Sequence, residues 1–249
     1  MTYQTKRDFP PRDDNSRFRQ SQFPKGDLPQ DQEEQPDPQY STRRKIAVYG
    51  GSFDPIHNGH ILIANKIVEL GLVDEVLFVP TLNHPHKKNG LAASAEHRLN
   101  MLRLALEPYK QFSFTDIEIA KADEPSYTID TITTLTHVFT DCELFLLIGM
   151  DCLANLHTWH RATELVQRNK FIIYPRPKCL PPPIFELQKR FGAVNAHKLM
   201  GSIIQDPELE LSTLNATEIR NAEKDKLSIE KFVPEAVDKY IKDNKIYSR

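Results

Sequence analysis

Residues 46–60 read Ile46-Ala47-Val48-Tyr49-Gly50-Gly51-Ser52-Phe53-Asp54-Pro55-Ile56-His57-Asn58-Gly59-His60. The apolar run 46–49 predicts a strand that is buried on both faces of a parallel sheet. Two glycines follow, and they leave the backbone open to a ligand. After Asn58, apolar residues at helical spacing predict a helix that stops at Gly71. This order favours an anion site, because free N–H groups and the positive end of the helix dipole meet there.

Two histidines lie near the start of this predicted helix. His57 and His60 can each donate a hydrogen bond to a phosphate oxygen, and Gly59 between them lets a ligand come close. The four residues 57–60 alone also fit a simpler interpretation, in which the histidines are capping or surface residues. The whole run favours a nucleotide site.

The run resembles the signature of the nucleotidyltransferases that carry a His-x-Gly-His motif, and within them it is most similar to the bacterial nicotinate-nucleotide adenylyltransferase family. Such enzymes transfer the adenylyl group of ATP to nicotinate mononucleotide. The resemblance implies that His57 and His60 are catalytic residues at the α- and β-phosphates. It implies ATP binding by residues of the run that share its turn and helix start: Gly50, Gly51, Ser52, Phe53, Asp54 and Gly59.

Downstream of the run, strand and helix patterns alternate. We expect strands at 75–80, 112–119, 144–149 and 171–174, and helices at 95–107, 128–139 and 162–168. This alternation predicts an α/β fold, a Rossmann-like doubly wound parallel sheet with helices on both faces. Ligands of such sheets bind at the carboxyl ends of the strands. Gly50, Pro80 and Gly149 each end a predicted strand, so their loops should share that edge.

A second motif, 79–88, follows the predicted strand 75–80 and resembles a family loop that ends in Pro-x-His-Lys. The resemblance implies that Asn83 contacts the nicotinate substrate and that Lys87 neutralises phosphate charge. Without the resemblance, the segment fits an ordinary basic loop. Further on, Arg98 lies in another segment that resembles the family. Two roles for Arg98 are equally open, a structural ion pair and a contact with the nucleotide.

A third motif joins residues 125–131 with residues 148–160. The resemblance implies that Trp159 stacks on the nicotinate ring, with Tyr127 beside it, and that N–H groups at Thr128 and His160 hold the carboxylate. Trp159 could instead be a core anchor. Gly149 and Asp151 are implied in nucleotide binding, Asp151 through a ribose hydroxyl, although Asp151 also fits a helix N-cap.

A fourth motif, 214–220, resembles the family's Ile-Ser-Ser-Thr-x-Ile-Arg. The resemblance implies that Thr217 and Arg220 grip the ATP phosphates, together with Arg176 from an Arg-Pro pair after the last predicted strand. Asn215 can cap the helix that begins here, with Glu218 three residues on. Ala216 stands where the family has serine, so one hydroxyl donor is missing.

These motifs imply an enzyme of NAD biosynthesis that makes deamido-NAD (nicotinate adenine dinucleotide) and pyrophosphate from ATP and nicotinate mononucleotide. Mg²⁺ is expected, held mainly by substrate phosphates rather than by protein ligands. One alternative is another adenylyl- or cytidylyltransferase of the superfamily, with a nicotinamide mononucleotide or phosphopantetheine acceptor. The other is a regulator that binds nucleotide without catalysis.

Composition narrows the class of protein further. The net charge of −2 gives no global attraction to nucleic acid or an anionic membrane, and three cysteines outside metal-ligand spacing suggest reduced thiols in a cytoplasmic protein. Residues 1–43 are rich in proline, glutamine and aspartate, so we expect a disordered tail, with the nucleotidyltransferase domain at 44–249. The tail could still offer a peptide to a partner. A homo-oligomer is also left open.

Overall fold

The computed structural model describes residues 43–81, 91–120, 126–206, 209 and 212–248. The predicted disordered tail lies outside the described residues, except for its last residue, Arg43. None of the helices that the structure describes combines the length and the apolar content needed to cross a membrane.

The described chain is built on a parallel sheet. Its strands are β1 (Arg44–Gly51), β2 (Glu75–Pro80), β3 (Phe112–Phe114), β4 (Cys142–Gly149) and β5 (Lys170–Tyr174). Their spatial order is β3-β2-β1-β4-β5, and every neighbouring pair is parallel. The order reverses between β1 and β4, as in doubly wound sheets, so the predicted α/β class and Rossmann-like topology are confirmed.

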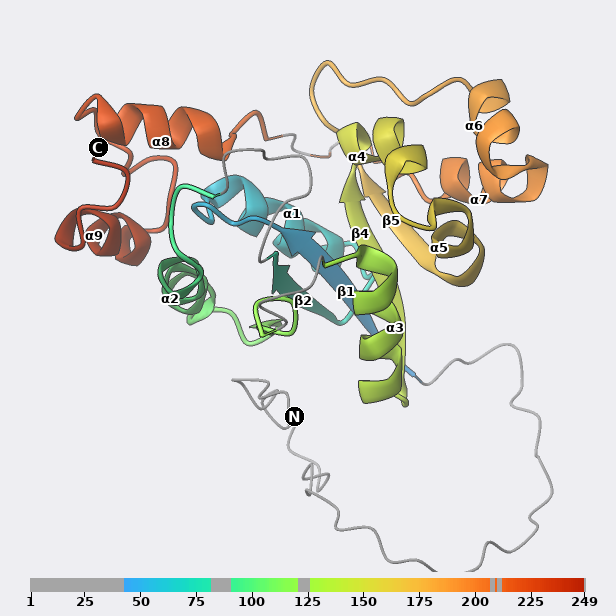
Figure 1. The fold of residues 1–249 in the computed structure, drawn as a ribbon, viewed down its shortest axis with the longest axis horizontal. Helices are drawn as coiled ribbons and strands as arrows, with labels where there is room; N and C mark the ends of the chain where they lie inside the picture. The colour runs from blue at the N-terminus through green and yellow to red at the C-terminus, as the bar shows by residue number, and fades with distance from the viewer. Residues whose placement is uncertain (1–42, 82–90, 121–125, 207–208, 210–211, 249) are drawn as a thin grey trace, which may run out of the picture.

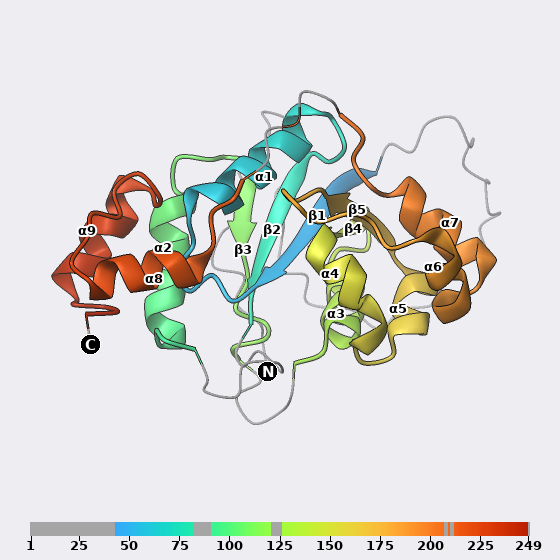
Figure 2. The ribbon, with the colours of Figure 1, turned by 90° about the horizontal axis from the view of Figure 1, so that it is seen from above.

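Helices follow the strands along the chain. They are α1 (Asn58–Glu69), α2 (Ala95–Leu106), α3 (Thr128–Val138), α4 (Met150–Asn155), α5 (Ala162–Arg168), α6 (Ile184–Phe191), α7 (Ala193–Gly201), α8 (Ala216–Lys224) and α9 (Glu235–Asp243), and η1 (Leu156–Thr158) is a 3₁₀ turn. The predicted stop of α1 is confirmed, since Gly71 takes a left-handed φ of 66° just beyond the helix. In Figures 1 and 2, α2, α8 and α9 gather at one end of the molecule and α5, α6 and α7 at the other.

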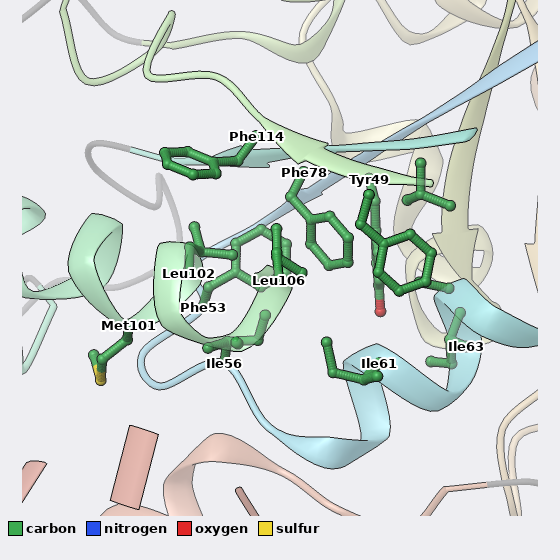
Figure 3. Close-up of a cluster of buried hydrophobic side chains, with 14 of the residues drawn as sticks. Tyr49, Phe53, Ile56, Ile61, Ile63, Phe78, Met101, Leu102, Leu106 and Phe114 are labelled. Atoms are coloured by element: carbon green, nitrogen blue, oxygen red, sulfur yellow. The ribbon is translucent and has the colours of Figure 1, made fainter. Parts of the chain in front are cut away.

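The sheet separates two apolar clusters. Alternation along β1 sends Ala47 and Tyr49 to a cluster shared with α1, α2, α8 and α9, and sends Ile46 and Val48 to a cluster shared with the helices from α3 to α7. Figure 3 shows part of the first cluster, where Tyr49 and Phe53 lie beside Phe78. Helices therefore cover both faces, and β1 is buried on both sides as its apolar run predicts.

The prediction for β3 is wrong at its carboxyl end. We expected a strand over 112–119, but β3 pairs with β2 only through Phe114. The N–H of Thr115 still donates to the carbonyl of Phe78, at 3.0 Å. The carbonyl of Thr115 would next accept from residue 80, which is a proline without an N–H, so the ladder stops and the chain turns.

Candidate active site

The carboxyl ends of the strands meet at one edge of the sheet. The register aligns Gly51 of β1 with Pro80 of β2, and Gly149 of β4 with Tyr174 of β5. The predicted common edge is confirmed. Since β1 and β4 flank the point where the strand order reverses, the loops after these two strands border the position where doubly wound sheets bind ligands.

His57 and His60 lie at the start of α1, one as its N-cap residue and the other in its first turn. Their rings stack with centroids 3.7 Å apart, and the backbone N–H of His57 donates to Nδ1 of His60 at 3.2 Å. Because Nδ1 of His60 accepts, the proton of the neutral ring is on Nε2, which is left as the donor. The structure thus brings the two predicted catalytic histidines together and fixes the tautomer of one.

Burial keeps both histidines neutral. Only 5% of His57 is exposed, and burial, with a smaller contribution from the positive charge of Arg176, lowers its pKa to about 4. The pKa of His60 lies well below its usual value, first because of burial and then because of His57 and Arg176. At neutral pH the pair can therefore offer N–H donors but no positive charge.

Gly59 has a different immediate neighbour from the one we predicted. A Cβ on this residue would lie 2.4 Å from Oγ of Ser212 and 3.1 Å from Nδ1 of His57. The missing side chain therefore makes room for the hydroxyl of Ser212, which approaches α1 from the segment before α8. Nδ1 of His57 is buried and has no hydrogen-bond partner among the described residues.

In the turn between β1 and α1, two residues predicted to bind the nucleotide, Phe53 and Asp54, have buried side chains. Phe53 is 1% exposed and packs edge to face against His60, with ring centroids 5.0 Å apart, so its side chain supports the histidine from the core. The carboxylate of Asp54 is also buried and accepts hydrogen bonds from Ala92, Ala93 and Tyr247. Both side chains are buried, so a nucleotide contact by these residues would come from the backbone of the turn. Gly50, in contrast, has open space where a Cβ would be.

Gly149, Asp151 and Arg176 form a second group at the end of β4. Nε of Arg176 lies 3.0 Å from Oδ1 of Asp151, and a Cβ on Gly149 would clash with both atoms. This N–H has no partner in hydrogen-bond geometry, so the contact is an ion pair only. The N-cap of α4 is Gly149, so the alternative role of Asp151 as an N-cap is wrong. Both charged residues remain partly exposed at the strand edge.

The segments predicted to bind nicotinate are also adjacent. The rings of Tyr127, the N-cap of α3, and His160, just after η1, stack with centroids 4.0 Å apart. Trp159 is half-buried and packs against the apolar cluster on the α3 side of the sheet. This packing agrees in part with the alternative interpretation of Trp159 as a core residue. An ion pair of 3.5 Å between Arg161 and Asp130 further ties the two segments together.

The fourth motif forms the first turns of α8. Oδ1 of Asn215 accepts from the N–H of Glu218 at 2.9 Å, which confirms the predicted N-cap. Arg220 donates from Nη1 to the carbonyl of Asp54 at 2.7 Å and from Nη2 to Oγ1 of Thr217 at 3.1 Å. These bonds join α8 to the turn after β1 and leave further N–H groups of the guanidinium available.

Three other predicted residues have different outcomes. Asn83 and Lys87 lie outside the described residues. Arg98 is 1% exposed and donates to the carbonyl of Ser52 at 2.8 Å, on the inner side of the turn. Arg98 forms no salt bridge among the described residues, so it is not part of the predicted ion pair, and its buried side chain supports the turn from the protein interior.

Comparisons with known proteins agree with this geometry. A family model described as cytidylyltransferase-like matches residues 48–222. A Methylacidiphilum infernorum protein named a probable nicotinate-nucleotide adenylyltransferase is 34% identical over 207 residues, or 83% of this chain and 94% of that protein. The nicotinate-nucleotide adenylyltransferase of Bacillus subtilis is 33% identical over 82% of this chain and 98% of its own length. This chain belongs to the nicotinate-nucleotide adenylyltransferase family.

A solved member of this family has the same fold. The nicotinic acid mononucleotide adenylyltransferase of Plasmodium falciparum complexed with NaAD superposes with a TM-score of 0.67 over 82% of this chain and 98% of that one, at 23% identity. The likeness at this identity concerns the fold alone.

Sequence reasoning about this adenylyltransferase missed Ser212 and Tyr247 as residues near the site. Ser212 lies two residues upstream of the fourth motif, and Tyr247 lies outside all four motifs. The signal available for Ser212 was a hydroxyl two residues upstream of a motif that lacks one. For Tyr247 no local signal exists, because its partner Asp54 is 193 positions away.

Proposed function

We propose that this protein transfers the adenylyl group of ATP to nicotinate mononucleotide, giving deamido-NAD and pyrophosphate. The observation that carries the proposal is the neutral, stacked His57–His60 pair at the start of α1, at the edge where β1 and β4 end. Family membership supports the same reaction. A Plasmodium falciparum relative of the same fold was solved with NaAD, and another structure of it with APC.

In the proposed reaction, a 5′-phosphate oxygen of nicotinate mononucleotide attacks the α-phosphorus of ATP. The bond from that phosphorus to the bridging oxygen breaks, and pyrophosphate leaves with the bonding electrons. The attacking phosphate is already an anion at neutral pH, so no general base is needed. Catalysis then consists of positioning and of stabilising the charge that develops on phosphate oxygens.

We assign Nε2–H of His60 to this charge, with His57 stacked beside it. The backbone of the turn from Gly50 to Asp54 and the N–H of Gly59 in the first turn of α1 would hold phosphate oxygens, as would Thr217. The cationic groups Arg176, Arg220 and Lys87 would hold the leaving pyrophosphate. Their charge complements the histidines, which contribute hydrogen bonds alone.

Nicotinate recognition is assigned to the contact between 127–128 and 159–160. The first N–H groups of a helix have no partner within the helix, so the start of α3 at Thr128 can accept a carboxylate. Trp159 would offer its free face to the pyridinium ring, and Asn83 would complete this end of the site. A carboxylate is the group by which nicotinate differs from nicotinamide.

We also propose that the reaction uses Mg²⁺ held by the substrate phosphates and water. The described residues contain no group of three or more histidine, cysteine, aspartate or glutamate side chains that could bind a metal. Ligands from the phosphates fit the preference of Mg²⁺ for oxygen and for a partly retained hydration shell. When bound, the ion neutralises phosphate charge.

A pyrophosphate-release assay tests the proposed function. The purified full-length protein is given ATP and nicotinate mononucleotide, and the dinucleotide product is identified by mass spectrometry. Parallel reactions replace the acceptor with phosphopantetheine, or ATP with CTP. We expect rapid turnover with ATP and nicotinate mononucleotide only. A preference for CTP or phosphopantetheine would assign the protein to another transferase, and no turnover with any pair would favour a nucleotide-binding regulator.

A further inference from the structure

The carboxylate of Asp54 joins three segments that are distant in sequence. It is 1% exposed, and it accepts from the N–H of Ala92 at 2.8 Å, the N–H of Ala93 at 3.1 Å and the hydroxyl of Tyr247 at 2.7 Å. The alanines precede α2, and Tyr247 follows α9 near the end of the chain. A buried carboxylate with three donors has the hydrogen bonds it needs without a salt bridge.

The same residue also holds Arg220. Its backbone carbonyl accepts from Nη1 of Arg220 at 2.7 Å. The guanidinium is therefore close to the Asp54 carboxylate but bonded to its main chain. If the carboxylate lost the Tyr247 donor, an ion pair with Arg220, or with Arg98, whose charge also interacts with Asp54, could take its place.

The conformation of the chain end supports a specific role for Tyr247. Lys245 and Tyr247 have φ values of 51° and 67°, and Phe53, next to Asp54, has a φ of 44°. Non-glycine residues rarely adopt this left-handed region, and it persists where surrounding contacts impose it. Here the left-handed residues are Tyr247 itself, Lys245 two positions before it, and Phe53 next to its partner Asp54.

Tyr247 also keeps the proton that it donates. Burial and the negative charge of Asp54 raise the pKa of its hydroxyl far above the usual value, although Arg220 and Arg98 partly oppose the shift. The hydroxyl therefore remains a donor to Asp54, the residue whose carbonyl also binds Arg220.

We propose that Tyr247 is a positioning residue for ATP. Its hydroxyl donates a hydrogen bond to the Asp54 carboxylate. Because the carboxylate has this donor, it does not pair with Arg220, and the guanidinium stays free for the triphosphate. The proposal rests on the assignment of Arg220 to the phosphates under the proposed function. It makes the end of the chain part of the ATP site without any contact to substrate.

The test compares two tyrosine-to-phenylalanine variants of the full-length protein. Tyr247→Phe should raise the KM for ATP about tenfold, the lower range for losing one hydrogen bond to a charged group, and leave the KM for nicotinate mononucleotide unchanged. The control is Tyr240→Phe, because that hydroxyl accepts from Asn100 and contacts His97 but not Asp54. It should leave the KM for ATP unchanged. Equal KM values for ATP in the two variants would overturn the proposal.

A double-mutant cycle shows whether Tyr247 acts through Arg220. ATP affinity is measured by calorimetry in the wild type, Tyr247→Phe, Arg220→Ala and the double variant, so the readout does not depend on turnover. We expect Tyr247→Phe to weaken ATP binding in the wild type and to have no further effect in Arg220→Ala. Additive losses would contradict the proposal. If the wild type bound ATP but showed no turnover, the result would count against the proposed function. The cycle would still test Tyr247, because it measures ATP affinity alone.

Discussion

At the residue scale, the site uses histidines that carry no charge. His57 and His60 are stacked and buried, and burial is the main reason for their lowered pKa values. A neutral ring placed by a fixed hydrogen bond needs no reorganisation when charge develops on a nearby oxygen. In the proposed function the positive charge comes from other segments, through Arg176, Arg220 and Lys87.

Loss of the His60 donor should stop turnover without unfolding the protein. His60→Ala removes a donor that we place at transition-state charge, so kcat should fall by roughly 10² to 10³. The measurement is steady-state kinetics at saturating ATP, with the melting temperature as a check on folding. His137→Ala, at an exposed position of α3, is the matched control and should keep full activity. Near-normal turnover of His60→Ala would remove the histidine from catalysis.

Burial of His57 should also make stability depend on pH. Its pKa is about 4 in the folded protein and near 6.5 when unfolded, so the unfolded state binds a proton first as the pH falls. The free energy of unfolding should therefore decrease from about pH 6.5 to about pH 4, by roughly 2 kcal/mol at pH 5 for this residue. Urea unfolding at pH 8 and pH 5 measures it. His57→Gln should reduce the difference between the two pH values and His137→Gln should not, and an unchanged difference in His57→Gln would show that His57 is not the cause.

At the scale of elements, the site depends on where helices begin. The starts of α1, α3 and α8 carry three of the four motifs, and each start presents N–H groups that have no partner within the helix. The cap of α8 is the one that departs from the family pattern, with Asn215 and Ala216 in place of serines. Asn215 retains the capping bond, so the helix that carries Arg220 still begins at the expected residue.

Removing this cap should weaken α8 and ATP binding together. Asn215→Ala deletes the acceptor for the Glu218 N–H, a change that costs about 0.5 to 2 kcal/mol at helix N-caps. We expect a lower free energy of unfolding in urea and a higher KM for ATP, with the KM for nicotinate mononucleotide unchanged. Asn215→Asp, which keeps a capping oxygen, should retain the stability. If Asn215→Ala lost no stability, the cap would have no energetic role in α8.

Much of this architecture could be predicted from local patterns, and the exceptions have physical reasons. Helix α5 begins and ends where its spacing predicts, because its apolar residues face one side only. Helices α6 and α7 were not predicted, because 181–201 resembles no family motif, although Ile184, Leu187 and Phe191 follow helical spacing and Gly192 ends α6. The pairing of Asp54 with Tyr247 depends on contact between distant segments, and so does the contact of Ser212 with Gly59.

At the scale of the whole molecule, the groups assigned to the phosphates and those assigned to nicotinate come from helices on opposite sides of the sheet. The helices α1 and α8, on one side, present the groups assigned to the phosphates, and α3 and η1, on the other, present those assigned to nicotinate. Helix α1 follows β1, and η1 follows β4 through α4, so both sets border the reversal of strand order between these two strands. This arrangement would place the acceptor phosphate between the groups that hold the two substrates.

The most direct test of the account is the choice between nicotinate and nicotinamide mononucleotide as acceptor. If backbone N–H groups hold the carboxylate, kcat/KM should be higher for nicotinate mononucleotide than for nicotinamide mononucleotide. We expect a ratio of roughly 10 to 150, the range for one charge-assisted hydrogen bond. Trp159→Ala should raise the KM for nicotinate mononucleotide more than the KM for ATP. Equal kcat/KM values for the two mononucleotides in the wild type would contradict the account, and so would equal effects of Trp159→Ala on both KM values.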